Sequence, residues 1–339
     1  MNIDLVFEYG SRNTSLPGNL PLPRPNGTTP RFPPANGTLP RPWNATIPRG
    51  NLPVVLNSSE TFWTGVYLYQ RITPIIVDAG GTLYSYVRPL DRGGLNFSVI
   101  IKLPNKSAAE SLAIVAPLFS DLNKIGIPVV ARPAPNPEAD PRIPKTGLWN
   151  PPGNTKFASR FFPRSNWDNA TIYNATFAAI RASVEAGFTF HGVDHHAPLS
   201  VAGYPGNHTA INPIWRASIM HADIFDNNFK GFSTTDAKTF WDGHRNLTKV
   251  MDRIRAVTPT SGAYFNEGDV LEPDWQRTFY GPYYPRLAQI KRARDPWGLF
   301  WAPTTPGSEA WKVVVQDDLP TQNGPLCQTG FVYEESGED

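Results

Sequence analysis

The chain has 339 residues, of which 40% are hydrophobic, and this is enough to build a sizeable buried core. Its formal net charge is +2, from 31 basic and 29 acidic residues that form no block of one sign, so the sequence predicts no nucleic-acid binding. A single cysteine, Cys327, excludes an internal disulfide and a cysteine-based zinc site. No apolar run reaches the roughly 18 residues of a membrane span, so no membrane contact is predicted.

Eleven Asn-x-Ser/Thr glycosylation acceptor patterns are spread along the chain, more than its composition alone predicts. They indicate a secreted glycoprotein, although an enrichment of Asn and Thr in turns would give the same pattern. The first residues, MNIDLVFEYGSRN, lack the basic segment and the apolar run of a signal peptide. We therefore expect the natural N-terminus to lie upstream of Met1.

Residues 1–57 are predicted to form a Pro-rich, sequon-rich linker or loop, because eleven prolines lie between positions 13 and 53. From there on the periodicity is that of a packed domain. Residues 58–72 have the apolar spacing of a helix, which Pro74 is expected to end. Residues 94–103 alternate as a strand does, and the helix predicted over 107–126 begins with a Ser-x-x-Glu capping box.

The alternation of helix and strand continues toward the C-terminus. A short strand is predicted over 127–134, a helix over 170–187, and strands over 188–195 and 214–225. A further helix carries one apolar face, formed by Phe240, His244, Leu247, Met251 and Ile254. Paired strands separated by helices indicate an α+β fold, in which an antiparallel sheet is flanked by helices and preceded by the Pro-rich irregular segment.

The densest titratable cluster is HGVDHH, which contains His191, Asp194, His195 and His196. On a strand His191 and His195 would share one face, so at most two imidazoles converge. A catalytic zinc site needs three protein ligands, and the sequence has no H-E-x-x-H motif. We predict no metal site, although a metal hydrolase built on this cluster stays an alternative.

Motifs for nucleophilic catalysis and for phosphate binding do not occur in the sequence. It contains no G-x-S-x-G elbow, no G-x-G-x-x-G turn and no G-x-x-x-x-G-K-[ST] loop. The lone cysteine lies in a tail flanked by Gly and Pro, which is a poor setting for a nucleophile. A Ser or Cys nucleophile and a phosphate-binding loop within this chain are therefore both disfavoured.

The stretch SGAYFNEGDVLEPDW, residues 261–275, concentrates polar groups between two turns. It holds four carboxylates, those of Glu267, Asp269, Glu272 and Asp274. They could pair for acid–base chemistry, or they could only favour the first turn of the helix that follows. In an extended segment Tyr264 and Asn266 point to the same face, where a phenol beside an amide can meet a polar ring.

Two parts of this region, GAYFNEGD and EPDWQRTFYGPYYPRLAQIKRARDPWGLFWAPTTPGSEAW, resemble the C-terminal segment of berberine-bridge-enzyme-like flavoproteins of the vanillyl-alcohol-oxidase superfamily. The resemblance is to the fungal, secreted, isoamyl-alcohol-oxidase-like group. It rests on a Y-x-N element, a Y-P-R-L helix, a K-x-x-x-D-P-x-G-x-F turn and a terminal G-S-E-x-W. Residues 62–87 and 204–221 are also similar, so that most of 60–312 is covered.

The resemblance implies a substrate domain over 58–260, a C-terminal segment over 261–312 that returns to the flavin domain, and a tail over 313–339. It implies an FAD-linked oxidoreductase that passes a hydride from an alcohol or a related C–H substrate to the flavin, with O2 as the acceptor. By this analogy Asn266 binds the FAD cofactor. Tyr264 is the catalytic residue, although no Lys or Arg near it in sequence favours its ionised form.

Three further tyrosines of the segment, Tyr280, Tyr283 and Tyr284, stay as alternatives to Tyr264. The family's Gly-rich pyrophosphate loop and attachment histidine are not found here, and Cys327 lies beyond the matched region. We therefore expect a C-terminal portion of a longer enzyme, inactive alone, with its FAD-binding domain upstream or in trans and a small molecule as substrate. A non-catalytic secreted glycoprotein that keeps the domain as a binding module is the alternative.

Overall fold

The computed structural model of the protein describes residues 2–10, 54–129, 156–202, 209–226, 237–314 and 324–330. Its centre is a seven-stranded sheet with the order β2–β1–β4–β3–β6–β7–β5. Neighbouring strands are antiparallel except β1 and β2, which are parallel. The strands of this sheet are β1 (Asn2–Tyr9), β2 (Val54–Leu56), β3 (Thr82–Pro89), β4 (Leu95–Lys102), β5 (Phe157–Pro163), β6 (Thr189–Asp194) and β7 (Ser218–Phe225).

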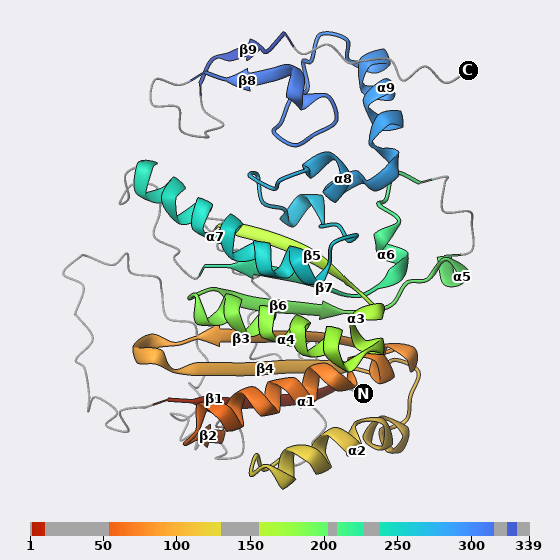
Figure 1. Cartoon of the computed structure of the whole chain (residues 1–339). Helices are drawn as coiled ribbons and strands as arrows, with labels where there is room; N and C mark the ends of the chain where they lie inside the picture. The colour runs from red at the N-terminus through yellow and green to blue at the C-terminus, as the bar shows by residue number, and fades with distance from the viewer. Residues whose placement is uncertain are drawn as a thin grey trace, which may run out of the picture.

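Long helices cover one face of the sheet, and Figure 1 shows them running along the strands. They are α1 (Ser59–Asp78), α4 (Ala170–Glu185) and α7 (Ala237–Val257), with α2 (Ala108–Lys124) packed against α1. Four short helices connect or follow them: α3 (Ser165–Asp168), α5 (Leu199–Ala202), α6 (Ile214–Ala217) and α8 (Trp275–Tyr280). Helix α9 (Tyr284–Arg294) and the hairpin of β8 (Trp311–Val313) and β9 (Leu326–Gln328) lie beyond the β5 edge (Figure 1). None of the described helices has the length and apolarity to span a membrane.

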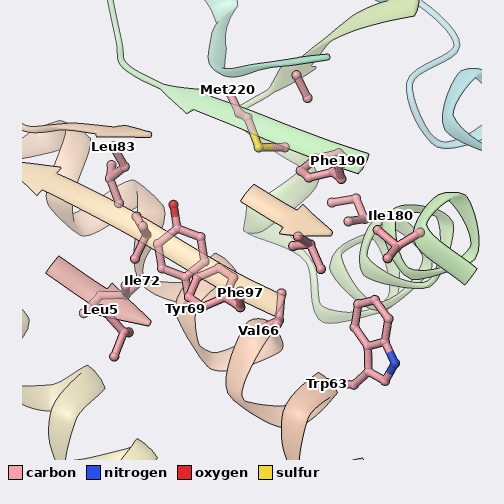
Figure 2. Close-up of a cluster of buried hydrophobic side chains, with 14 of the residues drawn as sticks. Leu5, Trp63, Val66, Tyr69, Ile72, Leu83, Phe97, Ile180, Phe190 and Met220 are labelled. Carbon is pink, nitrogen blue, oxygen red and sulfur yellow. The ribbon is translucent and has the colours of Figure 1, made fainter. Parts of the chain in front are cut away.

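The hydrophobic core lies between the sheet and the helices (Figure 2). Leu83 of β3 and Phe97 of β4 are fully buried there against Val66 and Tyr69 of α1. Strand residues alternate between the two faces, so each neighbour of a core residue points the other way. Burying one such side chain contributes about 1.5–3 kcal/mol. The opposite surface of the sheet, which we call the open face, carries exposed Tyr84.

The α+β prediction and the antiparallel sheet are confirmed, as is the capping box at the start of α2. Ser107 Oγ accepts the N–H of Glu110, and a Glu110 carboxylate oxygen accepts the N–H of Ser107. On α7 the predicted face is buried at His244, Leu247, Met251 and Ile254. The side chain of Phe240 lies outside the described residues.

The assignment of 1–57 to a linker is corrected at its two ends, because residues 2–9 and 54–56 form β1 and β2. The cause is the alternation of Ile3, Leu5 and Phe7, which are buried in the core while β1 pairs with β4 along its whole length. This run is short, yet β1 is held on both sides, by β2 and by β4. The intervening prolines lie outside the described residues.

Helix α1 does not end before Pro74 but continues to Asp78. Proline removes the N–H that would bond to the carbonyl four residues earlier. That carbonyl, of Gln70, instead accepts the indole N–H of Trp167 at 2.8 Å. The helix also gains by burying Ile76 in its last turn.

Two predicted strands differ from the structure: one begins later than predicted, and the other is not formed in its described part. Residues 214–217 form α6 because Pro213 favours a helical turn and Asn212 Oδ1 accepts the N–H of Ile214 at 3.1 Å. The strand predicted over 127–134 is not formed at 127–129, and its remainder lies outside the described residues.

Candidate functional site

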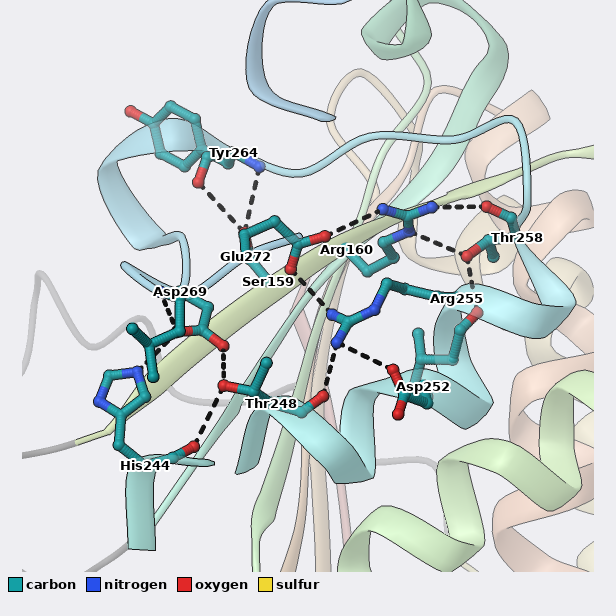
Figure 3. Close-up of polar contacts among 12 residues, drawn as sticks. Ser159, Arg160, His244, Thr248, Asp252, Arg255, Thr258, Tyr264, Asp269 and Glu272 are labelled. Atoms are coloured by element: carbon teal, nitrogen blue, oxygen red, sulfur yellow. Dashed lines mark hydrogen bonds and ion pairs between the residues drawn. The ribbon is translucent and has the colours of Figure 1, made fainter. Parts of the chain in front are cut away.

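Tyr264 and Asn266 lie side by side in the loop that follows α7. The Tyr264 N–H donates to Ser159 Oγ of β5 at 3.1 Å, and the Ser159 hydroxyl donates back to the Tyr264 carbonyl at 3.2 Å (Figure 3). The exposed amide of Asn266 donates to the Tyr264 phenolic oxygen at 2.8 Å. Since the amide occupies a lone pair of that oxygen, the phenolic hydrogen is left for another acceptor.

A hydrogen-bonded cluster, which we call the imidazole–carboxylate cluster, lies on the open face beside Tyr264. It consists of His191 on β6, His221 and Asp223 on β7, and Glu267 in the loop. The β6–β7 register places His191 opposite Asp223, and His191 Nδ1 lies 3.1 Å from Asp223 Oδ2. His221 Nε2 lies 3.0 Å from Asp223 Oδ1 and 2.8 Å from Glu267 Oε2.

The charges of this cluster stabilise one another. Burial disfavours a positive His221, but the hydrogen bonds and charges of Asp223 and Glu267 outweigh it and raise the pKa of His221 to about 9. Burial likewise opposes ionisation of Asp223, and its contacts with His191 and His221 nevertheless lower its pKa. At neutral pH the centre of the cluster is therefore an imidazolium held between two carboxylates.

Three residues of this cluster, and not the HGVDHH stretch, are arranged as possible metal ligands. Within the described ranges, His221, Asp223 and Glu267 form the one group of possible ligands whose donor atoms lie within 4.8 Å of one another. The HGVDHH sequence contributes none of them. His191 does enter the cluster through Asp223, whereas Asp194 is buried on the helix side, where Tyr69 donates to it at 3.1 Å.

An aromatic column extends the cluster along the sheet. The Tyr86 ring stacks on His191 with centroids 4.1 Å apart and an interplanar angle of 6°. The Arg88 guanidinium lies 3.8 Å from the Tyr86 ring centroid, a cation–π contact. Burial raises the pKa of Tyr86 and lowers that of Arg88. The polar surface thus reaches from β3 to the loop of Tyr264.

A pocket of about 420 Å³ opens beside Tyr264. The Trp215 and Tyr264 rings meet edge to face with centroids 5.4 Å apart, and His221 lies 5.6 Å from Tyr264. The pocket wall is formed by Ala210, Ile211, Asn212, Trp215, Arg216, Ala263, Tyr264, Phe265, Phe279 and Tyr280. This size and apolar lining suit a small organic molecule.

Two of the four loop carboxylates are buried anchors rather than site residues (Figure 3). Asp269 lies 2.6 Å from His244 Nε2 and accepts the Thr248 hydroxyl at 2.5 Å, both on α7. Glu272 accepts Arg255 Nη1 at 2.9 Å, and Arg160 Nη1 lies 3.6 Å from its other oxygen. Burial lowers the pKa of Arg160 to about 10, so it stays charged and pairs with Glu272.

Of the other two loop carboxylates, one lies at the surface and one belongs to the imidazole–carboxylate cluster. Asp274 is exposed and pairs with Arg277 at 2.5 Å beside the start of α8. Glu267 alone reaches the imidazole–carboxylate cluster. The hydroxyls of the alternative tyrosines Tyr280 and Tyr284 donate to the Thr304 carbonyl and to Glu309, which gives both a structural role.

Sequence reasoning missed His221 and Asp223. They lie two residues apart on β7, where strand periodicity places both side chains on one face. That alternation was present in SIMHADIF, but without the strand order nothing indicated that this face meets Tyr264.

Comparison with known proteins points to one family. Residues 263–305 match the family model described as "Berberine and berberine like". An uncharacterized FAD-linked oxidoreductase of Arthroderma benhamiae is 30% identical over 272 residues, 75% of this chain and 45% of that protein. The FAD-linked oxidoreductase patO of Aspergillus clavatus is 28% identical over 276 residues, 80% of this chain and 45% of that protein.

The fold agrees with a solved structure of the same kind. The crystal structure of the VAO-type flavoprotein MtVAO615 from Myceliophthora thermophila C1 superimposes with a TM-score of 0.59 at 20% identity, covering 79% of this chain and 47% of that one. The chain spans about half the length of the curated relatives it matches. The resemblance inferred from the sequence is confirmed.

Proposed function

We propose that this chain, a relative of the berberine-bridge-enzyme-like flavoproteins of the vanillyl-alcohol-oxidase superfamily, is the substrate-side part of an enzyme that oxidises a small alcohol with FAD. Its relatives are FAD-linked oxidoreductases, and the fold is that of VAO-type flavoproteins. The substrate, O2 as acceptor and a separate FAD-binding domain belong to the proposal. So does secretion, which the eleven sequons support.

The residues of this chain suit the flavin end of FAD and not its diphosphate. The sequence holds no Gly-rich loop for a diphosphate, and we assign the binding of that part of FAD to a separate domain. The open face carries the buried ring nitrogens His191 Nε2 and His221 Nδ1, which have no hydrogen-bond partner among the described residues. Buried polar atoms are normally paired, so their state supports a ligand or a domain that completes this face. Asn266 is the residue we assign to the flavin.

An exposed apolar patch also favours contact with a separate FAD-binding domain. Trp297, Leu299 and Phe300 are 84%, 79% and 77% exposed. Asp295 accepts the N–H groups of Leu299 and Phe300 at 2.8 and 2.9 Å, which fixes the turn that presents them. Large apolar side chains presented together by a braced turn mark an interaction site. We assign this patch to the FAD-binding domain.

The chemistry assigned to this chain is proton handling at Tyr264. Bound FAD would supply the acceptor for the hydride. We assign the Tyr264 oxygen, in its phenolate form, as the acceptor of the proton of the substrate hydroxyl. Its ring lies beside that of His221, with ring centroids 5.6 Å apart. Ser159 holds the Tyr264 backbone and Asn266 holds its oxygen, so the phenol is positioned before the substrate arrives.

The observation that carries this proposal is the meeting of Tyr264, the imidazole–carboxylate cluster and the apolar pocket on the open face. The test is to co-express the chain with the FAD-binding half of the Arthroderma benhamiae relative and to record visible absorbance. We expect a complex with a flavin spectrum that is bleached anaerobically by an alcohol. In the Tyr264→Phe variant the spectrum should remain, and bleaching should slow by about 100-fold or more.

Two results would contradict the proposal. One is a flavin bound and reduced by the chain alone, without any partner domain. The other is a flavin-loaded complex in which Tyr264→Phe is reduced at the wild-type rate. The Tyr283→Phe variant is the control, because Tyr283 does not line the pocket and should leave the rate unchanged.

A further inference from the structure

The residues that line the pocket beside Tyr264 indicate which chemical class of ligand it binds. We propose that it binds a flat, mostly apolar alcohol that carries a carboxylate, with the carboxylate at Arg216 and the hydroxyl at Tyr264. The assignment of the hydroxyl end rests on the proposed function, whereas the assignment of the acidic end rests on the pocket alone.

The walls present ring faces and hydrocarbon to a ligand. Trp215, Phe265 and Phe279 contribute apolar rings. Tyr280 adds a fourth, because its hydroxyl already donates to the Thr304 carbonyl at 3.0 Å. The amide of Asn212 is also used, since its nitrogen donates to the Thr278 carbonyl and its oxygen accepts the Ile214 N–H. A planar apolar body fits this lining better than a sugar with many hydroxyls.

Two polar groups in the wall are left for a ligand. Arg216 donates through Nη1 to the Ala197 carbonyl at 3.1 Å and forms no ion pair in the described part of the chain. The Tyr264 oxygen accepts the Asn266 amide and has no further hydrogen-bond partner among the described residues. Among the described residues no carboxylate lines the pocket, so the positive charge of Arg216 has no partner in that part of the wall.

Arginine selects for a carboxylate in such a setting. Its planar guanidinium binds a carboxylate through paired N–H groups, and a charge-assisted hydrogen bond is about twice as strong as a neutral one. A pocket of about 420 Å³ holds a substituted single ring with both functional groups. The arrangement therefore favours aromatic hydroxy acids over neutral alcohols of the same shape.

The test compares matched ligands by ligand-observed NMR titration with the purified chain at pH 7. The probes are 4-(hydroxymethyl)benzoate, its neutral isostere 4-(hydroxymethyl)benzamide, and 4-methylbenzoate, which lacks the hydroxyl. We expect the hydroxy acid to bind about tenfold more tightly than the amide. In Arg216→Gln this ratio should fall to about one, and Arg216→Lys should keep part of it.

Controls separate this inference from folding and from the proposed function. Arg286→Gln removes an exposed arginine that does not line the pocket, and it should preserve the tenfold ratio. Tyr264→Phe should abolish only the advantage of the hydroxy acid over 4-methylbenzoate. Equal affinity for acid and amide, no binding of any probe to a folded chain, or displacement of the acid by riboflavin would overturn the inference. These titrations need no flavin, so failure of flavin reduction leaves the result for Arg216 standing.

Discussion

Asp194 is a carboxyl group buried in the hydrophobic core, and its replacement by Asn should change how stability depends on pH. Its side chain is 0% exposed, Tyr69 donates to Oδ2 at 3.1 Å, and Oδ1 has no hydrogen-bond partner among the described residues. Burial raises its pKa to about 8, although the Tyr69 hydrogen bond lowers it in part. The folded protein therefore holds a proton that the unfolded chain releases near pH 4.

The sign follows from this difference in proton affinity. A group whose pKa is raised on folding stabilises the folded state at low pH, and this contribution is lost as the pH rises through the folded value. With a pKa of about 8 when folded and ~3.9 when unfolded, the loss between pH 5 and 8 is at most ~4 kcal/mol. Asp194→Asn cannot titrate, so it should not share this loss.

Urea unfolding followed by circular dichroism at pH 5, 6.5 and 8 measures the effect. The free energy of unfolding of Asp194→Asn, minus that of wild type, should become more favourable to the variant by a few kcal/mol as the pH rises. Asp226→Asn is the control, since Asp226 pairs with Lys156 at 2.7 Å and its loss should give no such gain. A difference that stays constant with pH would refute the reasoning.

Three further predictions concern the loop, the glycans and the cluster. Glu272→Gln leaves buried Arg160 and partly buried Arg255 without their carboxylate and should cost about 3–5 kcal/mol in the free energy of unfolding, whereas the exposed Asp274→Asn should cost under ~1 kcal/mol; equal costs would contradict the burial argument. In a secretory host, mass spectrometry should find Asn105 glycosylated because it is exposed, but Asn96 bare because its amide donates to Glu8 within the sheet; a glycan on Asn96 would contradict this. NMR of labelled imidazoles should show His221 protonated at pH 7 with a midpoint near 9, and its stabilising effect should be complete below ~6.5 and lost as the pH rises through 9; a midpoint under 7 would contradict the ion-pair assignment.

Local signals in the sequence predicted most helices and strands. The capping box of α2 and the alternation over 94–103 are properties of adjacent residues, and both appear in the structure. The continuation of α1 past Pro74 depends on the indole N–H of Trp167, which lies 97 positions from Gln70 in the chain. A contact between residues so far apart cannot be recognised from local sequence, so the rule that proline ends a helix gave the wrong boundary.

The site was predictable to a similar degree. Tyr264 and Asn266 were proposed as site residues because they are close in sequence and share a motif. The structure joins them by a hydrogen bond, and their roles stay a prediction. His221 and Asp223 were missed because their role depends on β7 lying between β6 and β5, under the loop of Tyr264. Strand order is set by packing of the whole sheet, and one sequence does not reveal it.

Two charged clusters contact the loop of Tyr264, one on each side of the sheet, and they differ in how completely their polar atoms are paired. On the helix side, Arg160 donates to both the hydroxyl and the carbonyl of Thr258 and pairs with Glu272, so that cluster is tied into the fold. On the open face, His221 is 5% exposed and charged, yet its Nδ1 has no partner among the described residues. A buried imidazolium costs stability that apolar residues at the same positions would not, and such costs concentrate at functional sites. The loop is therefore anchored through Glu272 on the helix side of the sheet, while Tyr264 and Glu267, to which our proposal assigns the site, lie on the open face.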